Sequence, residues 1–190
     1  EQDLNRIDSI LKGELPHYDA GVDTSTRFIS DTGPFRAGRA YIKALLCVLA
    51  FQRPKSFEDE SDVYVSNDWF KRANSRNYHH FFPRAFLRKR EYNEWYANHI
   101  VNITIVDDYL NKARIRDKPP ATYMKAFRKS NPDIVKTMRT HLISLDTDGI
   151  WENDYDRFSE RRCAALSRQL EKRIIRQEID KGGQMPAPVP

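Results

Sequence analysis

Two adjacent histidines, His79 and His80, open an aromatic stretch that ends at Pro83, and two asparagines, Asn102 and Asn111, follow nine residues apart. Histidine titrates near neutral pH and can take a proton from water. A divalent ion held by neutral or anionic ligands can stabilise the charge that develops on a phosphate and on its leaving oxygen. This combination of residue types indicates a one-metal site for phosphodiester hydrolysis.

The spacing of these residues limits which of them can bind the metal and which can activate water at one site. Neighbouring residues of a regular strand point to opposite faces, so His79 and His80 need a turn at Pro83 and an irregular strand end to serve one site. One would then bind the metal and the other would activate water. Asn111 can offer its amide oxygen to the metal, and Asn102 can hydrogen-bond loop backbone and so hold His80 in orientation.

The segments around these residues predict a strand, turn, strand and helix in that order. The apolar run that ends at the histidines supplies the first strand, and the β-branched segment 100–106 supplies the second. Residues 84–90 form a loop or helical turn between them. Asp107 or Asp108 is expected to cap a helix that carries Asn111.

The rest of the chain predicts mostly helices, and hence a mostly α-helical α+β fold with an embedded ββα-metal motif. Asp3 or Asn5 can cap a first helix with Leu4 and Leu11 on its apolar stripe, and residues 13–34 are predicted to form loops. Further helices are expected at 37–49, as the central packing element of the N-terminal region, and at 120–129, 131–142 and 156–180. Trp69, Trp95 and Trp151 are expected in the core, and the tail 182–190 is expected to be disordered.

Composition favours one soluble domain of residues 1–181, comprising a helical region of residues 1–70, a ββα core at about 75–118 and C-terminal helices 119–181. The chain has 190 residues, 39% of them apolar and 12% aromatic, with a mean hydropathy of −0.74. No apolar run is long enough for a membrane span. Cys47 and Cys163 are too few for a disulfide framework or a Cys-rich zinc site, which favours the cytoplasm. A polar start without Met suggests a piece of a longer protein.

Positive charge is concentrated around the histidines. Residues 71–130 carry 14 basic against 5 acidic residues, a net charge of +9, whereas residues 1–70 carry 8 against 12, a net charge of −4. Such a field attracts a polyanion and binds phosphates, although a basic face that is simply solvated is the alternative. The expected DNA contacts are Arg84, Arg88, Lys112, Arg114, Arg116 and Lys118. His17, His99 and His141 lack such a context and are expected to be structural or exposed.

The segment from Asn77 to about Arg128 resembles the HNH nuclease domain at the C-terminal end of GmrSD-type, modification-dependent restriction proteins and their SspE-like relatives. The resemblance rests on Tyr78-His79-His80-Phe81-Phe82-Pro83, Asn102-Ile-Thr-Ile-Val, Asn111-Lys112 and Pro119-Pro120. It implies that His80 is the general base, that Asn102 orients it, and that His79 and Asn111 bind the metal. His79 stands where many HNH enzymes have Asp, and Asn111 where many have His.

The resemblance also implies a cofactor and partners. One divalent ion is expected, Mg²⁺ or Mn²⁺ first, with Ni²⁺ or Zn²⁺ left open by the two departures. The expected partners are DNA and an N-terminal nucleotide-hydrolysing sensor domain, in a bacterial cytoplasm, with a second copy required if both strands are cut. Two alternatives to a DNA endonuclease stay open: a non-catalytic nucleic-acid-binding module with a structural histidine pair, and an RNA-directed nuclease.

Overall fold

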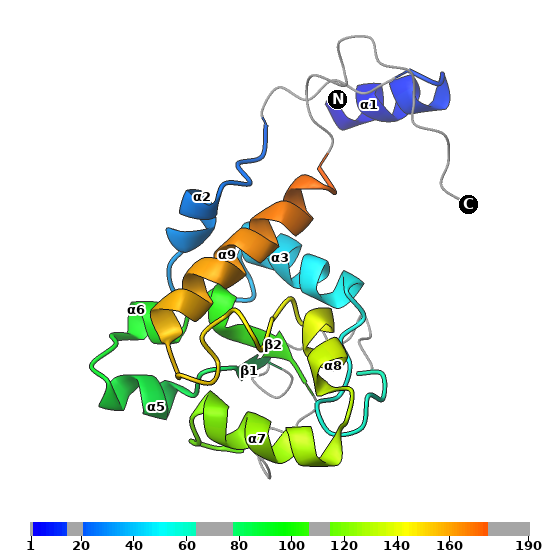
Figure 1. Ribbon diagram of the computed structural model, residues 1–190. Coiled ribbons are helices and arrows are strands. Elements are labelled where there is room, and N and C mark those ends of the chain that lie inside the picture. Colours follow the sequence, from blue (N-terminus) through cyan, green and yellow to red (C-terminus); the bar gives the residue numbers. More distant parts are fainter. Residues whose placement is uncertain (1, 15–20, 64–77, 107–114, 175–190) are drawn as a thin grey trace.

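The computed structural model describes residues 2–14, 21–63, 78–106 and 115–174 (Figure 1). In these residues the protein is a mostly α-helical α+β protein with a two-stranded sheet. The helices before the sheet are α1 (Gln2–Leu11), α2 (Thr26–Ser30) and α3 (Ala40–Phe51). Between and after the strands lie α5 (Arg84–Lys89), α6 (Glu94–Ala97), α7 (Pro120–Ser130), α8 (Ile134–Thr140) and α9 (Tyr155–Glu171).

The sheet pairs β1 (Tyr78–His80) with β2 (Ile103–Ile105) in antiparallel register, with His79 opposite Thr104 and His80 opposite Ile103. The predicted strand 100–106 is therefore too long. Residues Ile100–Asn102 instead form a 3₁₀ helix, η1, because His99 Nδ1 accepts a hydrogen bond from the Val101 amide and caps this turn. Asn102 consequently lies in η1 and not in the second strand.

Two apolar clusters flank the sheet. The first contains Ile42 and Leu46 of α3, Leu166 of α9, and Tyr78 with Ile103 from the strands. The second is rich in aromatic rings and contains Phe81, Phe82, Tyr123, Phe127 and Phe158. Figure 1 shows α9 beside α2 and α3 on one side of the sheet, with α7 on the opposite side. Helix α9 contributes to both clusters and therefore connects them.

Several predicted helices are observed, with two corrections to their extents. Helices α3, α7 and α8 lie within the predicted segments, give or take two residues at their ends, and α7 begins directly after Pro119, as expected for a proline-opened helix. The predicted loop 13–34 contains helix α2, which Ser25 caps by accepting from the Phe28 amide while Ile29 is buried. Helix α9 ends at Glu171 and residues 172–174 form a turn, so the prediction of an uninterrupted helix through these residues was wrong.

Trp95 is not a core residue: 46% of it is exposed, and its ring lies against Gly33. Its position on the four-residue helix α6 explains this, because Ala97 is the residue of that helix that faces the interior. Trp151 is half-buried and packs against the aromatic cluster, whereas Trp69 lies outside the described residues. The predicted disordered tail 182–190 also lies outside them.

Helix α1 presents its apolar residues to solvent. Leu4, Ile7, Ile10 and Leu11 are all more than half exposed. The helix is held locally by ion pairs one turn apart, Arg6 with Asp3 and Lys12 with Asp8. None of the helices in the described ranges is long and apolar enough to cross a membrane.

Candidate active site

His80 lies at the end of β1, where the chain leaves the sheet, and its side chain is only partly buried. Its Nε2 is 2.9 Å from the side-chain Oδ1 of Asn98. With the amide oxygen facing the ring, Nε2 carries the proton and donates it, and Nδ1 is left with a free lone pair. In this tautomer Nδ1 is the ring nitrogen that can accept a further proton, an arrangement that suits a general base.

The surroundings of His80 favour its neutral form. Burial lowers the pKa of His80 below its ordinary value of 6.5, and the positive charge of Arg84 lowers that pKa further. The hydrogen bond to Asn98 and the charge of Glu94 act in the opposite direction but do not reverse the shift. A histidine with a lowered pKa is unprotonated at neutral pH, which a base requires.

Asn102 ties the loop after His80 to the rest of the site. It is fully buried, and its Oδ1 accepts from the Phe82 amide at 2.8 Å. Its Nδ2 donates to the Phe82 carbonyl at 2.9 Å and to the Ala97 carbonyl at 3.0 Å. These bonds connect the loop two residues past His80 with the end of α6, one residue before Asn98. One side chain therefore fixes both the backbone beyond His80 and the segment that supplies the hydrogen-bond partner of His80.

His79 occupies the other face of β1. Because His79 and His80 are both paired in register with β2, their side chains point to opposite sides of the sheet. His79 is 3% exposed, and its carbonyl accepts from the Thr104 hydroxyl. The irregular strand end that would bring both histidines to one ion is not present in β1.

The expected metal site is therefore not assembled by the described residues. Asn111 lies outside them. No group of three or more His, Cys, Asp or Glu side chains in the described ranges is arranged to hold a metal ion. His79 alone, buried and turned away from His80, does not make a metal site with the donors the structure describes.

The basic residues expected to contact DNA fall into three groups. Arg84 and Arg88 lie on α5, which follows β1 and His80, and both form ion pairs with Glu94 of α6. Arg116 and Lys118 are exposed on the segment before α7. Lys112 and Arg114 lie outside the described residues. The ion pairs with Glu94 orient Arg84 and Arg88 at the edge of the site, and the carboxylate neutralises part of their positive charge.

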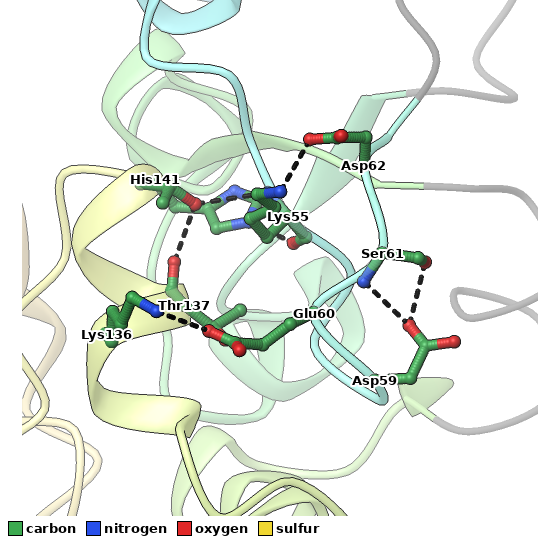
Figure 2. Close-up of polar contacts among 9 residues, drawn as sticks. Lys55, Asp59, Glu60, Ser61, Asp62, Lys136, Thr137 and His141 are labelled. Carbon is green, nitrogen blue, oxygen red and sulfur yellow. Dashed lines mark hydrogen bonds and ion pairs between the residues drawn. The ribbon is translucent and has the colours of Figure 1, made fainter.

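The other histidines that the structure describes are structural. His99 is buried and bonded to the Ser30 carbonyl and the Thr32 hydroxyl. His141 is buried and donates from Nε2 to the Lys55 carbonyl at 2.7 Å, next to the ion pair of Lys55 with Asp62 (Figure 2). Both therefore agree with the structural alternative in the sequence analysis, and His17 lies outside the described residues.

Two residues of the site were missed in the sequence, Asn98 and Glu94. They reach His80 because α6 folds back beside the end of β1, with Asn93 capping it through the Tyr96 amide. The signal in the sequence was Asn93 followed by Glu94, a cap residue and an acidic first-turn residue, which is weak evidence for a helix of four residues.

Comparisons with protein-family models, characterised proteins and solved structures found no match to this chain.

Proposed function

We propose that this protein is a metal-dependent DNA endonuclease in which His80 is the general base. The observation that carries the proposal is the partly exposed His80, neutral at pH 7, held by Asn98 and followed by a loop that Asn102 anchors. The net charge of +9 in residues 71–130 supports a polyanionic substrate.

In the proposed reaction His80 Nδ1 takes a proton from water, and the water oxygen forms a bond to phosphorus. The bond from phosphorus to the 3′ oxygen breaks, and that oxygen leaves with the bonding electrons and is protonated by solvent. Asn102 is a positioning residue that keeps the base and the loop in place. Arg84 and Arg88 hold the neighbouring phosphates of the strand.

A divalent ion belongs to the proposal, Mg²⁺ or Mn²⁺ first, with His79 and Asn111 as the ligands implied by the resemblance to HNH nucleases. Because His79 lies on the face of β1 opposite His80, it does not fit an ion at the phosphate that His80 would serve, and no step of the proposed reaction is assigned to the ion. The same resemblance supports a setting in restriction of foreign DNA, as the effector of a protein with a nucleotide-hydrolysing sensor domain.

The second candidate function is a nucleic-acid-binding module without catalysis. The observation that favours it is the separation of His79 and His80 on opposite faces of β1, together with the bond that already engages His80. In that case the histidines stabilise the sheet, and the basic residues alone account for binding.

Cleavage of supercoiled plasmid distinguishes the two. The protein and its His80→Gln variant are incubated with Mg²⁺, Mn²⁺, Ni²⁺, Zn²⁺ or EDTA, and open-circle and linear products are measured. Gln keeps a donor for Asn98 but cannot act as a base near neutral pH, so the variant should lose at least about 100-fold in rate and retain its DNA affinity. Equal cleavage by both proteins would contradict His80 as the base, and binding without cleavage in every metal would favour the second candidate.

The pH dependence gives an independent check on the base. His80 must be unprotonated to act, and its pKa lies below 6.5. The cleavage rate should therefore be level between pH 7 and 8 and should fall only as the pH drops below about 6.5. A rate that is halved near pH 7 or above would show that another group is the base.

A further inference from the structure

A separate cavity of about 260 Å³ lies between the end of α8, the turn 144–148 and α9. Three arginines line it: Arg139 from the last turn of α8, and Arg161 and Arg168 from α9. Arg161 and Arg168 are seven residues apart, two helical turns, and so lie on one face of the helix about 10 Å from each other. Ala165 lies between them and leaves the space open.

No acidic side chain among the residues that the structure describes pairs with these three arginines. No ion pair or side-chain hydrogen bond in the described part of the chain engages their guanidinium groups. The acidic residue that lines the cavity, Asp148, is 6% exposed and accepts from the Ser144 amide at 2.7 Å and the Thr147 hydroxyl at 3.0 Å. Its carboxylate therefore closes the turn 144–148.

Asp148 also interacts electrostatically with a buried cation, Arg162. Arg162 is fully buried, and its Nη2 donates to the Ile103 carbonyl of β2 at 3.0 Å. Burial lowers the pKa of Arg162 to about 9, and the charge of Asp148 opposes that decrease. The single negative charge of the cavity thus offsets Arg162 behind it, and the positive charge of Arg139, Arg161 and Arg168 remains for a ligand.

We propose that this cavity binds a phosphate group, with Arg139, Arg161 and Arg168 as its charged contacts and the Ser144 hydroxyl as a neutral donor. Guanidinium groups bind phosphate oxygens in bidentate geometry. The cavity is smaller than the roughly 300–1,000 Å³ that encloses a drug-sized ligand, so it suits the phosphate and not the whole molecule that carries it. That phosphate belongs either to a free nucleotide or to a nucleic-acid backbone.

This inference does not depend on catalysis by His80, and it is tested by binding with EDTA present. Calorimetric titrations of the full chain use pyrophosphate, ATP and adenosine, and fluorescence anisotropy measures binding of a labelled DNA duplex at several salt concentrations. Two variants of equal size separate charge from shape: Ala165→Glu places a carboxylate between Arg161 and Arg168, and Ala165→Gln places a neutral amide there. The double variant Arg161→Gln/Arg168→Gln is compared with Arg36→Gln, an exposed arginine outside the cavity.

We expect Ala165→Glu and the double variant to bind the phosphate ligand at least tenfold more weakly than their controls, with unchanged melting temperatures. Loss of pyrophosphate and ATP binding, with adenosine inert, would support the site and identify a free nucleotide as its ligand. Loss confined to the duplex, with a salt slope smaller by about one, would support it and identify a backbone phosphate. Equal affinities of variants and controls for every ligand, or no binding of any ligand by the parent protein, would overturn the proposal.

Discussion

At the scale of single residues, Asn102 has the most distinctive environment in the site. Its three hydrogen bonds join Phe82 and Ala97, which are 15 positions apart in the chain, and all three residues are buried. Removing the amide leaves backbone groups without partners, and each such buried group costs roughly 1–3 kcal/mol. Asn102 therefore serves both the stability of the fold and the position of His80.

We expect Asn102→Ala to lower the free energy of unfolding by about 2–4 kcal/mol, measured by urea denaturation. In the plasmid assay, at a temperature where the variant is folded, the rate should fall while DNA affinity is kept, because His80 loses its orientation. Asn102→Asp is the matched comparison: it keeps the acceptor for the Phe82 amide and removes both donors. A variant as stable and active as the parent would show that the three bonds contribute nothing.

His141 makes the stability of the protein depend on pH. Its pKa is about 4 in the folded protein because of burial, against 6.5 when it is exposed in the unfolded chain. Between these values the unfolded chain binds a proton that the folded protein does not, so the free energy of unfolding decreases as the pH falls from about 6.5 to 4. The decrease attributable to this residue is about 3 kcal/mol.

The His141→Gln variant isolates this contribution. Gln can still donate to the Lys55 carbonyl, but it does not titrate, so the stability difference between parent and variant should shrink by about 3 kcal/mol between pH 7 and 4. Urea denaturation at intervals of half a pH unit measures it. Parallel stability curves for the two proteins would mean that His141 is as readily protonated folded as unfolded.

At the scale of elements, the close approach of Gly33 to α6 ties the segment after α2 to the helix beside the site. Gly33 has a φ of +72°, and a Cβ added there would lie 2.7 Å from Cη2 of Trp95. Gly33→Ala should therefore lower the free energy of unfolding by about 1–3 kcal/mol, through backbone strain and displacement of the ring. Combining it with Trp95→Ala should recover the part due to the ring, at least about 0.5 kcal/mol of coupling. If the losses of unfolding free energy in the two single variants simply added up in the double variant, the whole effect of Gly33→Ala would come from backbone strain.

The helices that could be predicted are those whose start, end or apolar spacing is determined by residues close together in the sequence. Helix α7 begins at Pro120 and α3 ends before Pro54, and such signals are complete within a few residues. The fold class was correct for the same reason, because apolar spacing along each helix is a local property. Helix α2 was missed because five residues carry too little periodicity to be distinguished from a loop.

The site shows where local signals end. Asn102 was expected to bond loop backbone, and it does bond the Phe82 amide, although it lies in η1 and not in the strand where it was expected. The bond of His80 to Asn98 could not be predicted, because it depends on the path of α5 and α6 between the two strands. In a regular strand, alternation alone places His79 and His80 on opposite faces. The sequence could not show that this strand is regular, because its regularity depends on the pairing of β1 with β2.

At the scale of the whole molecule, the two apolar clusters are coupled through shared elements. Phe158 and Leu166 are two turns apart on α9, and Phe158 packs in the aromatic cluster whereas Leu166 packs in the other. Around β1, Phe81 likewise belongs to the aromatic cluster and Tyr78 to the other. Neither cluster can lose its packing without exposing some of α9 or of the sheet. The described residues from α2 to α9 should therefore unfold in one transition, with equal calorimetric and van't Hoff enthalpies.

Helix α1 should stand outside that cooperative unit. Leu4, Ile7, Ile10 and Leu11 are 52–80% exposed, so α1 buries little of the apolar area that stabilises a fold. Deleting residues 1–12 should leave the single transition in place and shift its midpoint by less than about 2 °C, whereas Phe158→Ala should lower the free energy of unfolding by about 3–5 kcal/mol. Scanning calorimetry of the three proteins measures both effects. If the deletion lowered the midpoint by several degrees, α1 would have to bury its apolar face against the rest of the chain in solution.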